Sequence, residues 1–275
     1  MLAGRVRILS DLHLGHPASL IGAAAELRPL LEGVDTVVFN GDSCELAYAG
    51  WTERGQDLMD DLQSLCGEVG VRALFLTGNH DPGISELGWL DLWDGALLVT
   101  HGDMVHREVA TWSREYLSSK QEVAAVWEER DELEDDLRKR WEGVRAVEEI
   151  LRVKRPPKVH LRGKLQLLSA VWPLERPFAI LRAWATMFPA ALDFMKRYRP
   201  EARVMVFGHF HRPGISWRDG RLLVNLGAFT RGAIPLAVDL EGDWMRVRRV
   251  TRNDGGEFRP AAAWRTYRID SPRRR

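Results

Sequence analysis

Five short clusters of acidic, imidazole and amide side chains punctuate this chain, and each directly follows an apolar run typical of a buried β-strand. They are Asp11-Leu12-His13, Gly41-Asp42-Ser43-Cys44-Glu45, Gly78-Asn79-His80-Asp81, His101-Gly102-Asp103 and Gly208-His209-Phe210-His211. Five of the eight histidines fall within them. Because ligand sites in open α/β sheets form beyond the carboxyl ends of the strands, the five loops are expected to converge on one crevice.

The residue types in the clusters predict a metal site. Carboxylate, imidazole and carboxamide groups together suit manganese, iron or zinc better than calcium or a structural tetrahedral zinc. Seven candidate ligands exceed the needs of one ion, and a carboxylate can bridge two, so two divalent ions are expected, with manganese preferred. A single cluster of this kind is more often a turn or a helix cap. Turns and caps alone do not explain why five such clusters each follow a predicted strand.

In this order the five clusters resemble the motif blocks of the calcineurin-like metallophosphoesterase superfamily. The resemblance implies an α/β fold of the metallophosphoesterase type, a two-sheet β-sandwich flanked by helices (αββα) and carrying a helical insertion. It also implies two ion sites that share Asp42, one completed by Asp11, His13 and His211 and the other by Asn79, His101 and His209. The activity implied is that of a dinuclear metal-dependent phosphohydrolase.

Two close cations provide a mechanism for such an enzyme. Ions about 3.5–4 Å apart share a water, lower its pKa and present a metal-bridging hydroxide in line with the phosphorus atom. They also neutralise the phosphoryl oxygens as the leaving group departs. The resemblance assigns protonation of the leaving oxygen to His80, and the neighbouring Asp81 is expected to fix the tautomer of its imidazole. The ordinary alternative is that His80 only caps the turn.

Three further features resemble one branch of the superfamily, the UDP-2,3-diacylglucosamine pyrophosphohydrolases of lipid A synthesis. Glu45 extends the second cluster to Gly-Asp-x-x-Glu, Asp103 extends the fourth to His-Gly-Asp, and Val224–Phe229 follows the last histidine pair. The branch implies a nucleotide- or lipid-linked pyrophosphate as substrate and a helical cap over its acyl chains. This chain has Gly-Asn-His-Asp where the branch has Gly-Asn-Arg-Asp. Glu45, Asp103 and His16 are the expected substrate contacts.

Two other functions fit the same residues. One is a general phosphodiesterase or phosphomonoesterase acting on nucleotides or nucleic acid, which gains from the arginine-rich C-terminus but lacks an obvious aromatic stacking platform in the core. The other is a non-catalytic scaffold of the same fold, which predicts eroded ligands, whereas all seven are present. The expected partner is therefore a small-molecule phosphate ester or a nucleotide-lipid substrate, and nucleic acid is disfavoured.

Apolar patterning places the clusters on an α/β core of residues 1–103 and 201–250. The expected strands are Arg5–Ser10, Asp35–Asn40, Val71–Leu76, Ala96–Thr100, Ala202–Phe207, Arg221–Leu226, Pro235–Leu240 and Trp244–Val250. Helical spacing is expected over Ala18–Leu31 and Gln56–Leu65. The later strands have no helices between them, so they are expected to form a meander that completes a second sheet.

Residues 104–200 are interpreted as a helical cap insertion, and residues 251–275 as a solvated basic tail. Ser119–Lys154 is expected to be one long helix with an acidic, projecting middle, and Pro156-Pro157 to end it. A second helical section follows over Lys158–Arg199. Because it is both basic and apolar, peripheral membrane contact through this section (158–199) is expected as much as packing on the core or on a partner subunit.

Composition sets outer limits on these expectations. The 275 residues carry 39 basic and 39 acidic side chains, a balance that argues against coating nucleic acid by bulk charge. Cys44 and Cys66 are too few for a disulfide scaffold and fit a reducing compartment. No apolar run reaches the roughly 18 residues of a membrane span, and Asp11 interrupts any signal-peptide core. The expected location is the cytoplasm, at the inner face of the membrane if the basic helical section binds lipid; the oligomeric state is left open.

Overall fold

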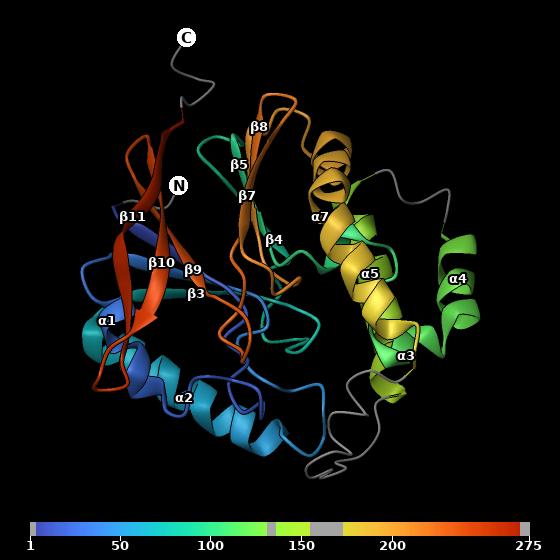
Figure 1. Ribbon diagram of the computed structural model, residues 1–275, viewed down its shortest axis with the longest axis horizontal. Helices are drawn as coiled ribbons and strands as arrows, with labels where there is room; N and C mark the ends of the chain where they lie inside the picture. The colour runs from blue at the N-terminus through green and yellow to red at the C-terminus, as the bar shows by residue number, and fades with distance from the viewer. Residues whose placement is uncertain (1–3, 131–135, 155–172, 270–275) are drawn as a thin grey trace.

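Two β-sheets packed against each other form the centre of the protein (Figure 1). The structure is a computed structural model that describes residues 4–130, 136–154 and 173–269. Its strands are β1 (Val6–Leu9), β2 (Thr36–Asn40), β3 (Arg72–Leu76), β4 (Trp89–Leu92), β5 (Leu97–Thr100), β6 (Val204–Phe207), β7 (Gly214–Arg218), β8 (Arg221–Asn225), β9 (Leu236–Glu241), β10 (Trp244–Arg252) and β11 (Phe258–Arg268). The first sheet has the strand order β11-β10-β9-β1-β2-β3, and the second has the order β4-β5-β6-β8-β7.

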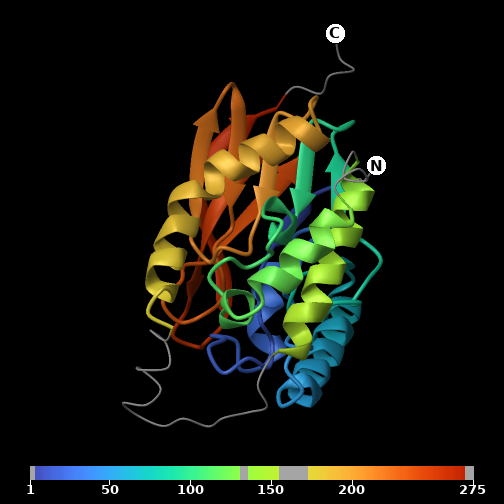
Figure 2. The ribbon, with the colours of Figure 1, turned by 90° about the vertical axis from the view of Figure 1, so that its right-hand side faces the viewer.

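Helices cover the outer face of each sheet. They are α1 (Arg28–Leu31, preceded by a 3-10 turn at Ala24–Leu27), α2 (Thr52–Val69), α3 (Arg114–Leu117), α4 (Lys120–Glu128), α5 (Leu137–Val153) and α7 (Arg176–Tyr198). The first two pack on the first sheet, whereas α5 and α7 pack on the second (Figure 1, Figure 2). The predicted α/β class, a two-sheet sandwich flanked by helices, is therefore confirmed.

Alternating side chains of the central strands explain why each sheet is buried on both faces. In β2, Val38 packs between the sheets, whereas Val37 and Phe39 pack beneath α1 and α2. In β5, Val99 faces the other sheet and Leu98 packs beneath the helices of the insertion. A slip of one residue would exchange these two environments, so the packing fixes the register of the strands whose ends carry the polar clusters.

The strands after the insertion divide between the two sheets, so the predicted meander in one second sheet is wrong. β6 and β8 pair in parallel within the second sheet, whereas β9 pairs antiparallel with β1 and β10 follows it in the first. The second sheet is completed by β4 and β7, edge strands that the apolar patterns did not predict. Neither edge strand contains a fully buried residue, so its hydrophobic pattern is weak.

Most of the described part of residues 251–275, predicted to be a solvated tail, belongs to the first sheet. β10 continues to Arg252 and pairs antiparallel with β11, which is 11 residues long. The Phe258 ring is only 3 % exposed and lies 5.4 Å from that of Phe229. The predicted tail is therefore a paired edge strand along most of its length, and residues 270–275 lie outside the described part.

Phe258→Ala is expected to lower the free energy of unfolding by about 3–5 kcal/mol, because removing a buried aromatic ring leaves a cavity against Phe229. Thr266→Ala, an exposed change on the same strand, is expected to stay within about 0.5 kcal/mol of the parent protein. Urea denaturation of the two purified variants measures both values. A loss below about 0.5 kcal/mol for Phe258→Ala would favour the solvated tail instead.

The insertion contains two helices where one long helix over Ser119–Lys154 was predicted. α4 and α5 are separate, and the Asp136 side chain caps the second by accepting a hydrogen bond from the Lys139 amide at 2.8 Å. The two helices pack closely, because a Cβ on Gly143 would lie 2.4 Å from the Trp127 ring. The two helices therefore do not form one projecting rod, and residues 131–135 of the acidic stretch between them lie outside the described part.

α7 is the described part of the second helical section, 158–199, since residues 155–172 lie outside the described ranges. By length and composition alone it is long and apolar enough to cross a membrane. One of its faces, which includes Met187 and Met195, is buried over the second sheet, as in a core helix. Phe178, near its start, is 74 % exposed. Packing on the core is confirmed for the buried face, and membrane contact through 158–199 stays a prediction.

Candidate metal centre

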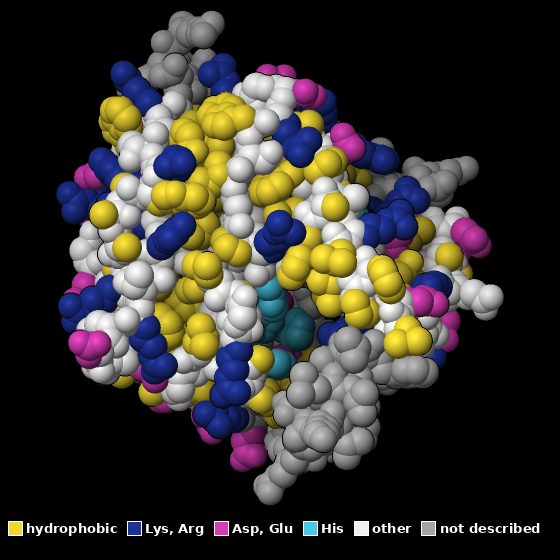
Figure 3. All heavy atoms as spheres, in the orientation of Figure 1, with side chains coloured by type: hydrophobic (Ala, Val, Ile, Leu, Met, Phe, Trp, Pro, Cys, Tyr) yellow, Lys and Arg dark blue, Asp and Glu magenta, His cyan; other side chains and the backbone are white. Residues whose placement is uncertain are grey.

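The five polar clusters lie together where five strands end. They follow β1, β2 and β3 in the first sheet and β5 and β6 in the second, and within each sheet these strands run parallel. Their carboxyl ends therefore share an edge. Figure 3 shows histidine side chains gathered in one hollow on this face of the molecule. The predicted convergence of the clusters on one crevice is confirmed.

Asp11, His13, Asp42 and His211 form a first group of possible ligands. One ligand atom of each lies within 4.8 Å of the others. The Nε2 atoms of His13 and His211 are only 3.0 Å apart, and His211 Nε2 lies 3.3 Å from Asp11 Oδ1. Two imidazole nitrogens directed at each other among carboxylates are suited to share a cation. The structure thus brings together the four residues predicted for one ion.

Asp42, His101 and His209 form a second group whose ligand atoms also lie within 4.8 Å of one another. His101 Nε2 is 3.3 Å from Asp42 Oδ2 and 3.3 Å from Asn79 Oδ1, so the amide joins this group. Asp42 belongs to both groups, which is the position of a bridging carboxylate. All seven predicted ligands therefore lie in the same hollow.

Left-handed backbone conformations mark the same loops. Nine described residues other than glycine have positive φ, and five of the nine are predicted ligands. These five are Asp11, His13, Asp42, His209 and His211, with φ between 50° and 68°. Such conformations cost about 1–3 kcal/mol each and persist where the surrounding structure imposes them, typically at functional sites. The rest of the fold therefore stabilises strained backbone conformations that direct these side chains into the hollow.

Two glycines allow the loops to approach the carboxylates closely. A Cβ on Gly208 would lie 2.1 Å from Asp11 Oδ2, and one on Gly78 would lie 2.4 Å from Asp42 Oδ1. The amide of His209, the residue after Gly208, donates to both oxygens of Asp11 at 3.1 Å. A side chain at either glycine would displace a carboxylate of the first group.

Burial sets the charge states of the histidines. It lowers the pKa of His13 well below its usual value and that of His209 to about 4. Both imidazoles are therefore neutral at neutral pH, which is the form that binds a metal ion. Burial also opposes charge on His101, yet Asp42 and then Asp11 raise its pKa well above the usual value. A protonated His101 thus balances the buried carboxylates, a task that a bound cation would take over.

Backbone carbonyls fix the outer nitrogens of two of these histidines. His101 Nδ1 lies 3.0 Å from the Asn40 carbonyl oxygen, and His209 Nε2 lies 3.0 Å from that of Val109. Each contact determines which ring nitrogen is left for the hollow. Val109 itself has a positive φ of 61°. Sequence reasoning missed both residues, because a main-chain acceptor leaves no signal in its side chain.

Glu45 makes the contact to His80 that was expected of Asp81. His80 Nδ1 lies 2.7 Å from Glu45 Oε2, and Glu45 is fully buried. The two oxygens of Asp81 instead accept hydrogen bonds from three backbone amides of the second and third clusters. Burial, and then Asp42, raise the pKa of Asp81 to about 7. Asp81 therefore ties two loops together, and Glu45, predicted to touch substrate, orients the histidine.

Asp103, also predicted to touch substrate, is buried and paired with the insertion. Arg145 of α5 forms an ion pair with its Oδ2 and donates to the Gly78 carbonyl oxygen at 3.3 Å. The same guanidinium pairs with Glu148 at 2.7 Å. Arg145 thus connects the insertion to the third and fourth clusters, beside a cavity of about 420 Å³ that Asn79 helps to line. No local sequence pattern distinguishes this arginine from its charged helical neighbours.

His16, the third predicted substrate contact, lies at the edge of the site. Its ring centroid is 5.9 Å from that of His13 and 4.7 Å from that of Trp51. Burial lowers its pKa to about 4, so it is neutral at neutral pH. Its position next to a candidate ligand is compatible with the predicted role.

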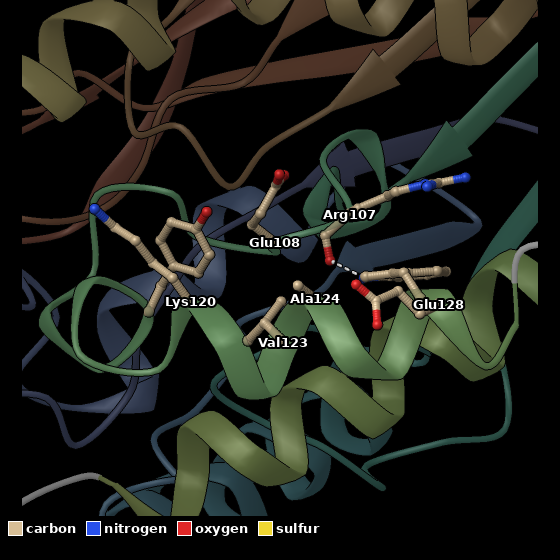
Figure 4. Close-up of a pocket in the computed structure, with 8 residues that line it drawn as sticks. Arg107, Glu108, Lys120, Val123, Ala124 and Glu128 are labelled. Carbon is tan, nitrogen blue, oxygen red and sulfur yellow. Dashed lines mark hydrogen bonds between the residues drawn. The ribbon is translucent and has the colours of Figure 1, made fainter.

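A second cavity, of about 260 Å³, lies over α4 and includes none of the predicted site residues. Figure 4 shows Val123 and Ala124 of α4 on one side of it, with Glu108 and Arg107 opposite. Trp127 donates its indole N–H to the Arg107 carbonyl at 2.9 Å. This cavity follows from the packing of α4 and is not part of the candidate metal centre.

Comparisons with known proteins agree with this geometry. A family profile described as calcineurin-like phosphoesterase matches residues 4–213. No curated protein matches the chain.

Several solved structures resemble the chain at low identity. A Vps29 single mutant from Entamoeba histolytica is 11 % identical, with 97 % of this chain and 99 % of that chain covered and a TM-score of 0.46. A dimetal phosphatase from Danio rerio is 15 % identical, with 89 % and 95 % covered and a TM-score of 0.47. A predicted phosphoesterase from Streptococcus pneumoniae TIGR4 is 14 % identical, with 95 % and 99 % covered and a TM-score of 0.37. All three TM-scores are below 0.5.

Proposed function

Because the chain belongs to the calcineurin-like phosphoesterase family, we propose that it is a two-metal phosphohydrolase that cleaves a nucleotide- or lipid-linked pyrophosphate. Phosphoesterase activity and divalent metal binding follow from the family and from the Asp and His clusters. The observation that carries the two-metal proposal is the pair of ligand groups that share Asp42. A carboxylate common to two sets of oxygen and nitrogen donors is what a two-ion site requires.

The donor set fits two divalent ions. One would be held by Asp11, His13, Asp42 and His211, and the other by Asp42, Asn79, His101 and His209. Mixed oxygen and nitrogen donors favour manganese, with iron or zinc as alternatives. When bound, such ions lower the pKa of water and neutralise charge on phosphoryl oxygens.

We assign to His80 the donation of a proton to the leaving oxygen. Its ring centroid lies 4.8 Å from that of His13, beside the first ligand group. Glu45 orients the ring through Nδ1. Asp42 Oδ1 accepts a hydrogen bond from the His80 amide at 2.7 Å, which fixes the backbone of the proton donor to the bridging carboxylate. Donor and ligands are thus held in one rigid unit.

The contact of α7 with the fifth cluster supports an amphiphilic substrate. Trp184 of α7 donates its indole N–H to the Phe210 carbonyl at 3.0 Å, which joins the helix to this cluster, and Arg212 lies over the Trp184 ring at 5.2 Å. Phe178 and Leu181, near the start of the same helix, are 74 % and 59 % exposed. Exposed apolar side chains on a helix joined to the site suit a phosphate that carries a lipid portion.

Hydrolysis of a small substrate panel tests this proposal. Metal-stripped protein, with manganese added back, is given p-nitrophenyl phosphate, bis-p-nitrophenyl phosphate, UDP-N-acetylglucosamine and an acylated UDP-glucosamine. We expect turnover only with metal, and a kcat/KM for the acylated compound roughly tenfold or more above the others, because buried acyl carbons add binding energy. Turnover confined to the simple esters would contradict the pyrophosphate substrate. No turnover with metal bound would contradict the proposed hydrolase.

A further inference from the structure

Two half-buried aromatic rings lie beside the candidate metal centre, just after the second cluster and just before α2. The ring centroids of Tyr48 and Trp51 are 5.0 Å apart, with 40° between their planes. Neither ring belongs to the three hydrophobic clusters found among the described residues. Large aromatic side chains that stay out of a core and next to a hollow are suited to contact a ligand.

Together with two histidines, these rings form a wall that leads away from the metal centre. The Tyr48 ring lies 6.0 Å from that of His80, with 36° between the planes. The Trp51 ring lies 4.7 Å from that of His16, which in turn is 5.9 Å from His13. The wall therefore begins at a candidate metal ligand and the candidate proton donor and ends at two uncharged rings. A group attached to a phosphate at the metal centre would lie along it.

Backbone hydrogen bonds hold the wall in place. The amides of Leu46 and Ala47 both donate to the His80 carbonyl oxygen, at 2.8 and 3.0 Å. The Trp51 amide donates to the Tyr48 carbonyl oxygen at 2.8 Å. Both rings are thus positioned by the loop of the candidate proton donor, and a ligand that stacks on them need not order a flexible segment first.

Charged groups of the insertion border the outer end of the wall. The Tyr48 hydroxyl lies 3.5 Å from Glu115 Oε1, at the edge of hydrogen-bond distance. Arg176, at the start of α7, donates to the Trp112 carbonyl oxygen at 3.3 Å. Burial and then Arg114 lower the pKa of Arg176, while Glu115 and Tyr48 oppose that shift, so these groups lie close enough to interact. Acceptors and donors around a ring surface suit a planar ligand with polar edges better than an acyl chain.

We propose that Tyr48 and Trp51 form a platform on which the base of a nucleotide substrate stacks while its phosphate lies at the metal centre. This inference rests on the proposed function and narrows the substrate class to nucleotides bound through the base. Every base presents a π face, so the platform confers affinity with little preference between bases. It differs from the sequence-based expectation that the core lacks an obvious aromatic stacking platform.

Binding of a nucleotide product tests the platform separately from catalysis. Isothermal titration of the manganese-loaded protein compares uridine 5′-monophosphate with ribose 5-phosphate, which has the phosphate and the sugar but no base. We expect the nucleotide to bind roughly tenfold more tightly or better than ribose 5-phosphate, and this ratio of affinities is the margin that the base provides. Tyr48→Ala and Trp51→Ala are each expected to remove most of the margin. The affinity for ribose 5-phosphate is expected to stay unchanged in both variants.

Two further variants separate stacking from folding. Trp51→Phe keeps a π face and is expected to keep most of the margin, whereas Trp51→Leu keeps apolar bulk and is expected to lose it. Trp217→Ala is the matched control, because this tryptophan on β7 is 57 % exposed and pairs with Tyr267 rather than with the wall. Thermal melting of each variant identifies any that fails to fold. The variants that do fold then show whether the margin in affinity depends on the aromatic rings.

The outcomes distinguish this inference from the proposed function. Equal affinities for the nucleotide and ribose 5-phosphate would overturn the platform even if the substrate panel shows hydrolysis. A margin that survives loss of both rings would overturn it as well. A margin that depends on the rings would support the platform even if no pyrophosphate in the panel is cleaved.

Discussion

Asp42→Ala is expected to lower kcat/KM by roughly 1000-fold or more and to reduce the bound manganese from two ions to at most one. Asp42 supplies a ligand atom to both groups, so a single substitution removes a donor from each ion. It also removes the carboxylate that does most to raise the pKa of His101 against burial. Turnover of bis-p-nitrophenyl phosphate and metal content by atomic emission measure the two effects.

Two variants make that prediction decisive. Asp42→Asn keeps the shape of the side chain and an oxygen for the His80 amide, so it is expected to fold and still to lose most turnover. Asp57→Ala removes an exposed carboxylate from α2 and is expected to change neither turnover nor metal content. Turnover of the Asn variant within about tenfold of the parent would exclude Asp42 as the bridging ligand.

Strands buried on both faces were predictable from the sequence, but their order in the sheets was not. Asp35–Asn40 contains the continuous apolar run Val37–Phe39 and coincides with β2 to within a residue, because packing on both faces demands such a run. The pairing of β9 with β1, which places Leu240 opposite Val6, is a long-range choice that no local pattern records. The sequence predicts a tail where β11 lies, because this edge strand buries few of its side chains and arginines dominate its hydrophobic pattern.

The candidate ligands were predictable because metal chemistry restricts them to a few residue types at strand ends. The groups that hold them were not, since Val109 and Arg145 belong to the insertion and reach the clusters only through the tertiary fold. The Gly-Asp-x-x-Glu spacing of the second cluster singles out Glu45, but only the structure shows that Glu45 contacts Nδ1 of His80. The apolar spacing predicts a helix that begins only at Gln56, whereas α2 begins at Thr52, directly after Trp51. The sequence pattern therefore does not show that Trp51 lies at the start of a helix.

His80→Ala is expected to keep both ions and to lower turnover by roughly 100-fold or more, because the leaving oxygen loses its proton donor. His80 belongs to neither of the two ligand groups that share Asp42, although it forms a third group of possible ligands with His13 and Glu45, whose ligand atoms lie within 4.8 Å of one another. Metal content of the purified variant separates the roles, since loss of an ion would make His80 a ligand instead. Glu45→Gln, which leaves the imidazole without its carboxylate, is expected to lower turnover by roughly tenfold.

The leaving group provides a sharper test of proton donation by His80. p-Nitrophenolate departs without a proton, whereas an alkoxide must be protonated as its bond to phosphorus breaks. We therefore expect His80→Ala to lose less than about tenfold on thymidine 5′-p-nitrophenyl phosphate and the full loss of roughly 100-fold on thymidine 5′-methyl phosphate. Equal losses on the two esters would contradict proton donation, and unchanged turnover on both would remove His80 from the mechanism. The two esters share the nucleotide and differ in the departing group, so the comparison isolates the proton from binding.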